Sequence, residues 1–115
     1  MDLGIRGRVA VVTGGSMGLG RAIAHALAAE GARVVLAARD EARLRQTAGE
    51  IAAATGAEVV PVATDMTKPE EIDALIAATV RRWGTVEIAV ANAGGPPSTR
   101  FDTTSAEQMQ AAITL

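Results

Sequence analysis

The sequence predicts an α/β fold in which helices cover both faces of a parallel sheet. Four short runs of apolar, mostly β-branched residues recur at residues 9–13, 34–37, 59–63 and 88–91. These runs are nearly continuous rather than alternating, which is typical of strands buried on both faces. Segments with helical spacing of apolar residues separate them. Strands that alternate with helices predict a doubly wound sheet.

The order of the elements along the chain predicts the order of the strands. Right-handed crossovers favour the strand order 3-2-1-4, with a switch point between the first and fourth strands. Pro61 lies inside the third run. Proline belongs in edge strands because it cannot donate a backbone hydrogen bond, and this order puts the third strand at an edge. The chain reaches Leu115 before any fifth strand.

Three amphipathic helices are expected between the strands. Their apolar stripes consist of Leu19, Ala22, Ile23, Ala26 and Leu27; of Leu44, Ala48, Ile51 and Ala52; and of Ile72, Leu75, Ile76, Val80 and Trp83. Gly31, Gly56 and Gly84 follow the stripes, at positions where glycine commonly ends a helix.

The sequence also predicts where the helices begin. Asp40 is expected to be the N-cap of the second helix. Residues 67–70, Thr-Lys-Pro-Glu, predict a capping box with proline in the first turn of the third helix. Residues 105–108, Ser-Ala-Glu-Gln, predict a second capping box, which would open a fourth helix towards Leu115 after a loop at 94–104.

Composition excludes several classes of function. The 115 residues predict one domain, residues 1–115, with a net charge of −2 and no cysteine or tyrosine. Disulfides, thiolate metal sites and catalysis by cysteine or tyrosine are therefore excluded. His25 is the only histidine, so no histidine metal cluster can form within one chain, and we expect it on the surface. The weakly acidic charge argues against a nucleic-acid partner.

No membrane or export signal is visible. Residues 1–8 contain no long apolar region and no cleavage pattern. The apolar runs are too short to cross a bilayer. We therefore expect no membrane partner and a cytoplasmic location.

A glycine-rich turn, residues 13–20 (Thr-Gly-Gly-Ser-Met-Gly-Leu-Gly), joins the first strand to the first helix. Such a turn lets backbone N–H groups and the helix N-terminus face a pyrophosphate. Gly14 would make the tight turn, Gly18 would let phosphates approach the backbone, and Gly20 would let the helix pack closely. This pattern favours a Rossmann-type dinucleotide site over a plain turn without ligand.

The end of the second strand bears on the choice of nucleotide. An acidic residue there usually reads a free ribose 2′-hydroxyl, whereas arginine meets a 2′-phosphate. Ala38 occupies the expected acidic position and Arg39 follows it. Arg39 therefore favours NADP(H) over NAD(H). In the competing interpretation Asp40 reads the ribose instead of capping the helix.

Several motifs together resemble the short-chain dehydrogenase/reductase family over essentially the whole chain. They are the glycine pattern of residues 13–20, Asp65 after the third strand, and Asn-Ala-Gly at 92–94. Gly-Gly-Pro-Pro at 94–97 also resembles a variant in 3-oxoacyl carrier-protein reductases and related carbonyl reductases. The resemblance implies an NAD(P)(H)-dependent oxidoreductase that reduces a small carbonyl substrate or oxidises an alcohol by hydride transfer. It also implies a homo-oligomer for a full-length chain.

The resemblance further implies a set of cofactor-binding residues. They are Gly14, Ser16, Met17, Gly18, Leu19, Gly20, Arg39, Asp65, Met66, Asn92, Ala93 and Gly94. Arg39 would meet the 2′-phosphate, and Asp65 would bond the adenine amino group beside Met66. Two positions depart from the family. Some NADP-using members carry arginine in place of Met17, and many carry asparagine in place of Ala91.

The family's catalytic groups have no counterpart in the sequence. The resemblance implies an asparagine on the helix after the fourth strand, a serine after a fifth strand, and a Tyr-x-x-x-Lys helix. Here Lys68 lies at the start of the third helix and Ser105 is a helix cap. We therefore expect the cofactor-binding, amino-terminal part of such an enzyme, inactive alone. A non-catalytic nucleotide-binding or protein-interaction module is the alternative, and a complete enzyme with another chemistry is the third reading.

Overall fold

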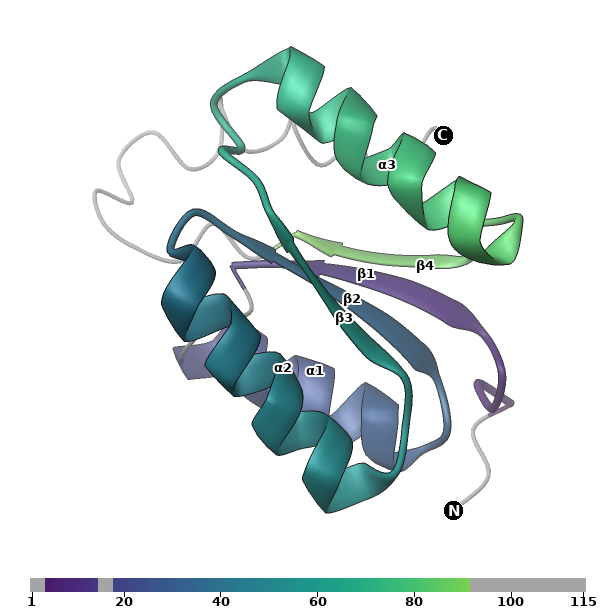
Figure 1. Cartoon of the computed structure of the whole chain (residues 1–115). Helices are drawn as coiled ribbons and strands as arrows, with labels where there is room; N and C mark the ends of the chain where they lie inside the picture. Colours follow the sequence, from purple (N-terminus) through teal and green to yellow (C-terminus); the bar gives the residue numbers. More distant parts are fainter. Residues whose placement is uncertain (1–3, 15–17, 92–115) are drawn as a thin grey trace.

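A computed structural model of the chain describes residues 4–14 and 18–91 (Figure 1). Strands and helices alternate along it. They are β1 (Val9–Thr13), α1 (Gly18–Ala29), β2 (Arg33–Ala38), α2 (Glu41–Thr55), β3 (Val59–Ala63), α3 (Pro69–Trp83) and β4 (Ile88–Ala91). All the predicted strands are confirmed, and β2 is one residue longer at each end than its apolar run. The loop and helix expected over 94–115 lie outside the described residues.

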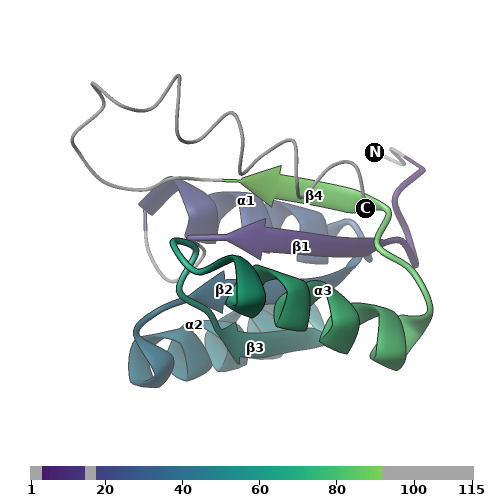
Figure 2. The same cartoon turned by 90° about the horizontal axis from the view of Figure 1, so that it is seen from above.

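The strands form one parallel sheet in the order β3-β2-β1-β4, as predicted. α1 and α2 cover one face and α3 lies on the other (Figures 1 and 2). Helices on both faces of a parallel sheet with this order make the Rossmann-type doubly wound fold. None of the helices within residues 4–14 and 18–91 is long and apolar enough to cross a membrane.

Pro61 fits the sheet because β3 is an edge strand. The carbonyl of Glu58 accepts from Val34, 2.9 Å, and the N–H of Thr64 donates to Ala38, 2.9 Å, so even-numbered residues of this segment bond towards β2. Backbone groups alternate in direction along a strand. The nitrogen of Pro61 therefore points to the open side of the sheet, where no ladder bond is lost.

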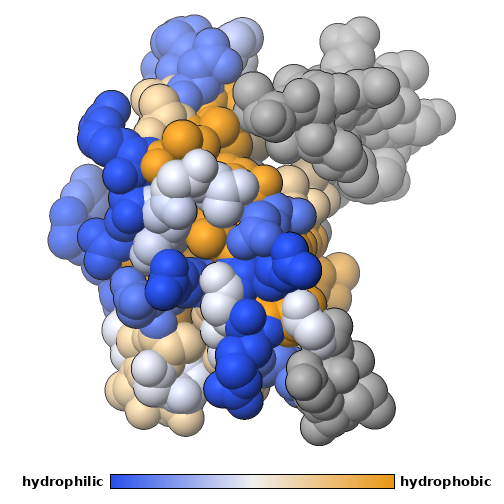
Figure 3. All heavy atoms as spheres, turned by 90° about the vertical axis from the view of Figure 1, so that its right-hand side faces the viewer, coloured by the Kyte–Doolittle hydropathy of each residue, from blue (hydrophilic) through white to orange (hydrophobic). Residues whose placement is uncertain are grey.

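The core has two layers, one on each face of the sheet. Val12, Val34 and Leu36 pack against α1 and α2 on one side, and Val11 and Val35 belong to the cluster beneath α3. This division follows from the alternation of side chains along a strand. The edge strands β3 and β4 are half-buried, whereas β1 is buried throughout. Figure 3 shows hydrophobic residues reaching the surface in the middle of the face it displays.

The buried face of α1 differs from the predicted stripe. The residues that face the core are Gly20, Ile23, Ala24, Leu27 and Ala28. Leu19, Ala22 and Ala26 are exposed instead. The helix is rich in alanine, so apolar residues occur on more than one of its faces and periodicity does not select between them. Packing selects the face with Gly20, Ala24 and Ala28, because small residues one turn apart let the helix approach the sheet.

The start of α3 also differs from the prediction. Lys68 is the N-cap, without a side-chain cap bond, and Pro69 opens the helix. The hydroxyl of Thr67 donates instead to Asp65 Oδ1, 2.6 Å away. The predicted capping box is therefore wrong, because the carboxylate two residues upstream competes successfully for the hydroxyl of Thr67.

The other predicted helix boundaries that fall within the described residues are confirmed. Asp40 caps α2, accepting the N–H of Arg43 at 3.1 Å. Gly56 and Gly84 end α2 and α3 in the left-handed conformation, with φ of 76° and 84°. On α3 the predicted stripe is right except at its end, where Thr79 is buried and Val80 is 42% exposed.

The burial pattern predicts a large loss of stability for one leucine truncation and almost no loss for another. Leu44 is 0% exposed in the core, whereas Leu19 is 66% exposed. Leu44→Ala should lower the free energy of unfolding by about 2–5 kcal/mol, because it removes buried methyl groups and leaves a cavity. Leu19→Ala should change it by less than about 0.5 kcal/mol. Urea unfolding followed by circular dichroism measures both, and similar losses would contradict the assigned face of α1.

Candidate cofactor site

The carboxyl ends of the strands lie along one edge of the sheet, where β1 and β4 point in the same direction (Figure 2). Ligands of open parallel sheets bind outside this edge, at the point where the strand order reverses. That point lies between β1 and β4. The glycine turn after β1, the segment after β2 and the segment after β3 all begin at this edge, so the candidate residues that the structure describes share one side of the molecule.

Gly14 and Gly18 belong to the glycine turn, and both have a left-handed backbone, with φ of 68° and 64°. Other residue types rarely adopt this conformation. The N–H of Gly14 donates to the carbonyl of Ala37 at 2.7 Å, which fixes the turn to the end of β2. A Cβ added at Gly18 would meet no atom of the described residues within 4 Å.

The N-terminus of α1 suits an anion. Its first turn contains no acidic residue, whereas those of α2 and α3 contain Glu41, and Glu70 and Glu71. The partial positive charge of a helix N-terminus is therefore not offset by side chains at α1. Leu19 presents an exposed apolar side chain there. Gly20 is buried towards the sheet.

Arg39 and Asp65 stand at the ends of neighbouring strands. Arg39 directly follows β2 and is exposed. Within the described residues no hydrogen bond or ion pair is assigned to its guanidinium. Its charge contributes to holding the pKa of Asp65 below the usual value. The next residue, Asp40, accepts the N–H of Arg43 and caps α2.

Asp65 is held in a tight turn. Its Oδ1 accepts the N–H of Thr67 at 2.9 Å and the hydroxyl of the same residue at 2.6 Å. Its own N–H donates to Oε1 of Glu71 at 2.8 Å. The bonds from Thr67 are the main cause of the lowered pKa of Asp65, followed by the nearby charges of Arg39 and Lys68.

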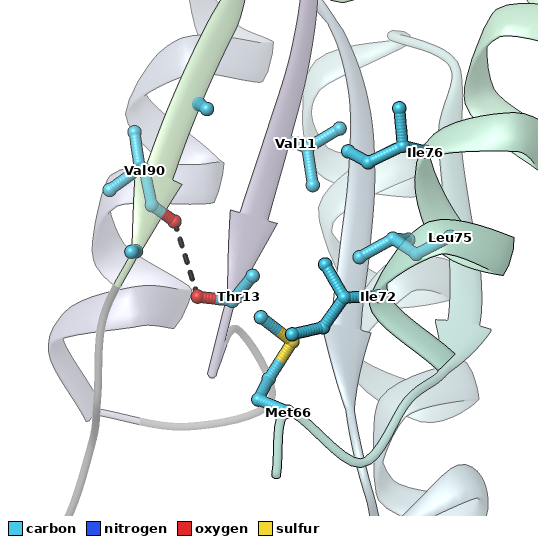
Figure 4. Close-up of a pocket in the computed structure, with 9 residues that line it drawn as sticks. Val11, Thr13, Met66, Ile72, Leu75, Ile76 and Val90 are labelled. Atoms are coloured by element: carbon cyan, nitrogen blue, oxygen red, sulfur yellow. Dashed lines mark hydrogen bonds between the residues drawn. The ribbon is translucent and has the colours of Figure 1, made fainter. Parts of the chain in front are cut away.

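The side chain of Met66 packs mainly against the core and not at the carboxyl edge of the sheet. Its side chain packs against the cluster beneath α3 and lines a small hollow between α3, β1 and β4 (Figure 4). The hollow is lined by Val11, Thr13, Met66, Ile72, Leu75, Ile76, Ala89, Val90 and Ala91. It is almost wholly apolar, and the hydroxyl of Thr13 bonds to the carbonyl of Val90 at 3.4 Å. The described residues that line the hollow offer no group for catalysis.

Ser16 and Met17 in the glycine turn, and 92–94 after β4, lie outside the described residues. Among the residues that are described, no three side chains of metal-binding type lie close enough to share a metal ion. His25 is exposed on α1, away from the core, as expected.

Sequence reasoning missed Thr67 and Glu71. Both contact Asp65, through its carboxylate and its backbone N–H respectively. A signal for the first was present, because Asp followed two residues later by Thr commonly forms a side-chain turn. The contact of Glu71 depends on how the chain enters α3 and had no comparable local signal.

The hydrogen bonds between Thr67 and Asp65 predict how the pKa of Asp65 responds to a substitution. Thr67→Val removes a hydroxyl that stabilises the Asp65 carboxylate, so the pKa of Asp65 should rise towards its usual value. The pKa of Glu87, which Arg8 lowers elsewhere, should not change and serves as an internal control. Carboxyl carbon NMR titration measures both values. A pKa of Asp65 unaffected by the substitution would contradict the turn.

Thr67→Val should also change how the stability of the fold depends on pH. A carboxyl whose pKa is lower in the folded state stabilises the fold above its unfolded pKa, and that contribution is lost as pH falls through the folded pKa. The stabilisation from Asp65 is therefore complete at neutral pH and disappears in acid. The variant should lose less stability than the wild type on acidification.

Comparisons with known proteins agree with this geometry. The chain matches the short chain dehydrogenase family over residues 8–115. It is 51% identical over 86 residues to the ketoacyl reductase 1 assigned to the granaticin polyketide synthase of Streptomyces violaceoruber, covering 75% of this chain and 31% of that protein. The chain therefore spans about a third of that relative's length.

Solved structures give the same result. L-sorbose reductase from Gluconobacter frateurii, complexed with NADPH and L-sorbose, is 40% identical with a TM-score of 0.81, over 96% of this chain and 42% of that one. A short chain dehydrogenase/reductase from Burkholderia phymatum in complex with NAD is 40% identical with a TM-score of 0.71, over 74% and 30%. The chain belongs to the short chain dehydrogenase family, whose members are oxidoreductases.

Proposed function

We propose that this chain binds NADP(H) at the carboxyl edge of its sheet, as the cofactor-holding part of an oxidoreductase that acts on a small carbonyl or alcohol substrate. One observation carries the proposal. The left-handed glycines Gly14 and Gly18 frame a turn at the N-terminus of α1, where no acidic side chain offsets the helix dipole. A pyrophosphate is the group that such a turn binds best.

The residues present fit the remaining parts of the cofactor. Leu19 would cover an apolar part of the bound nucleotide with its exposed side chain, and Asp65 would accept a hydrogen bond from the adenine amino group. The proposed site also includes Gly20, Met66 and the residues that are not described, Ser16, Met17, Asn92, Ala93 and Gly94. Because Met66 packs into the core, it would support the adenine site from below rather than bind the base through polar contacts.

Arg39 is the reason for preferring NADP(H). Guanidinium groups bind phosphate through paired hydrogen bonds, and Arg39 is exposed at the end of β2. Asp40, the competing ribose-binding residue, uses its carboxylate to cap α2. The relatives do not decide the matter, because one was solved with NADPH and another with NAD.

Bound NADPH would supply the hydride. The chain's own residues hold the cofactor, and the sequence contains no tyrosine that could donate a proton to a carbonyl oxygen. We propose that these 115 residues contribute binding and orientation and do not turn over substrate alone. A 3-oxoacyl substrate is the form of carbonyl compound that we favour, since a ketoacyl reductase is among the similar relatives.

Substitution of Arg39 tests this choice of cofactor. Arg39→Gln removes the charge that would meet the 2′-phosphate, so the dissociation constant for NADPH should rise about tenfold or more. The constant for NADH should change less than about twofold, because NADH has no such phosphate. Isothermal titration with each dinucleotide measures both constants.

Arg33, at the start of β2, provides a matched control. Arg33 stands at the opposite end of β2, beside Glu58 at 3.8 Å. Arg33→Gln should leave both dissociation constants unchanged. If the wild-type chain binds neither dinucleotide, the proposed function is wrong. If Arg39→Gln weakens both equally, the assignment of the 2′-phosphate to Arg39 is wrong.

A further inference from the structure

The carboxylate of Asp65 has one oxygen engaged and one available. Oδ1 accepts two hydrogen bonds from Thr67, at 2.9 and 2.6 Å. Within residues 4–14 and 18–91, no hydrogen bond is made to Oδ2. Because both donors of Thr67 reach the same oxygen, the carboxylate is held in one orientation, and Oδ2 is the oxygen left for a ligand.

The backbone beneath this carboxylate is also fixed. The N–H of Asp65 donates to Oε1 of Glu71 at 2.8 Å, and Oε2 of Glu71 lies 3.7 Å from Nζ of Lys68. One residue earlier, the N–H of Thr64 bonds to the carbonyl of Ala38 at 2.9 Å. The turn is therefore anchored both to the first turn of α3 and to the end of β2, directly beside Arg39.

We propose that Thr67 is a positioning residue that makes the site select a purine with a 6-amino group over one with a 6-oxo group. This inference rests on the proposed function, in which Asp65 faces the adenine. A carboxylate only accepts hydrogen bonds. It therefore attracts an amino group and repels a carbonyl oxygen. Thr67 contributes by holding Oδ1, so that Oδ2 keeps a fixed direction.

A purely structural role for Thr67 would have a different signature. The turn precedes α3, whose N-cap Lys68 makes no side-chain cap bond, so Thr67 could serve only to start that helix. Loss of such a role would weaken the binding of both purines equally. The ratio of two dissociation constants therefore separates positioning from general stability.

The experiment compares NADPH with its 6-oxo analogue, reduced nicotinamide hypoxanthine dinucleotide phosphate. The wild-type chain should bind NADPH about tenfold more tightly, the usual effect of one hydrogen bond to a charged group. Thr67→Val should reduce this preference to about threefold or less. Thr67→Ser keeps both donors and should retain it.

Thr55→Val is the matched control. The hydroxyl of Thr55 bonds to the carbonyl of Ile51 at 2.7 Å and accepts from Ala57 at 3.2 Å, at the far end of α2. The control removes the same chemical group, with two hydrogen bonds where Thr67→Val removes one. It should leave the preference for the amino purine unchanged even if it lowers stability.

Asp65→Asn gives a second, opposite test. The N–H of Thr67 can only donate, so it should hold the amide oxygen of asparagine and turn the NH₂ group towards the base. An NH₂ group donates to a 6-oxo purine and repels a 6-amino group. The preference should therefore reverse.

The outcomes are distinguishable. Failure of the wild type to bind either dinucleotide would overturn the proposed function and this inference together. Binding without preference would overturn the contact between Asp65 and the amino group. A wild-type preference that Thr67→Val leaves intact would overturn the role of Thr67 alone. A preference that Asp65→Asn does not reverse would overturn the contact between Asp65 and the amino group.

Discussion

Burial of β1 between two parallel neighbours is the constraint on which the rest of the structure depends. All five of its residues are buried, and it pairs with β2 on one side and β4 on the other. A strand buried on both faces and both edges must be apolar throughout and must satisfy its backbone within the sheet. Its direction then fixes where the chain leaves the sheet, which is the edge that carries the candidate site.

An ion pair stabilises the amino end of β1. Glu87, just before β4, pairs with Arg8 at 2.6 Å and accepts the N–H of Val9 at 3.2 Å. These contacts join the starts of two strands far apart in sequence. This ion pair lies at the amino edge of the sheet, whereas the candidate binding groups lie at the carboxyl edge.

Much of the fold could be predicted because the responsible signals are local and unambiguous. Continuous β-branched runs indicated the strands, and Gly56 and Gly84 indicated the helix ends. The exposed side of α1 could not be predicted, because its many alanines fit several faces and only packing against the sheet selects one. Of the candidate site, the glycine turn and Arg39 were visible as motifs, but the contact of Glu71 with Asp65 depends on the path of the chain into α3.

The failed prediction at Thr67 has a physical meaning. A threonine cap typically stabilises a helix by about 1 kcal/mol, yet Thr67 bonds to Asp65 and leaves α3 with Lys68 as its cap. Pro69 and the two acidic residues of the first turn compensate, because they favour a helix start without a side-chain cap. Local rules are most often broken at functional sites. The departure falls beside the carboxylate that we assign to the adenine, so Asp65 is held in place at the expense of a better helix start.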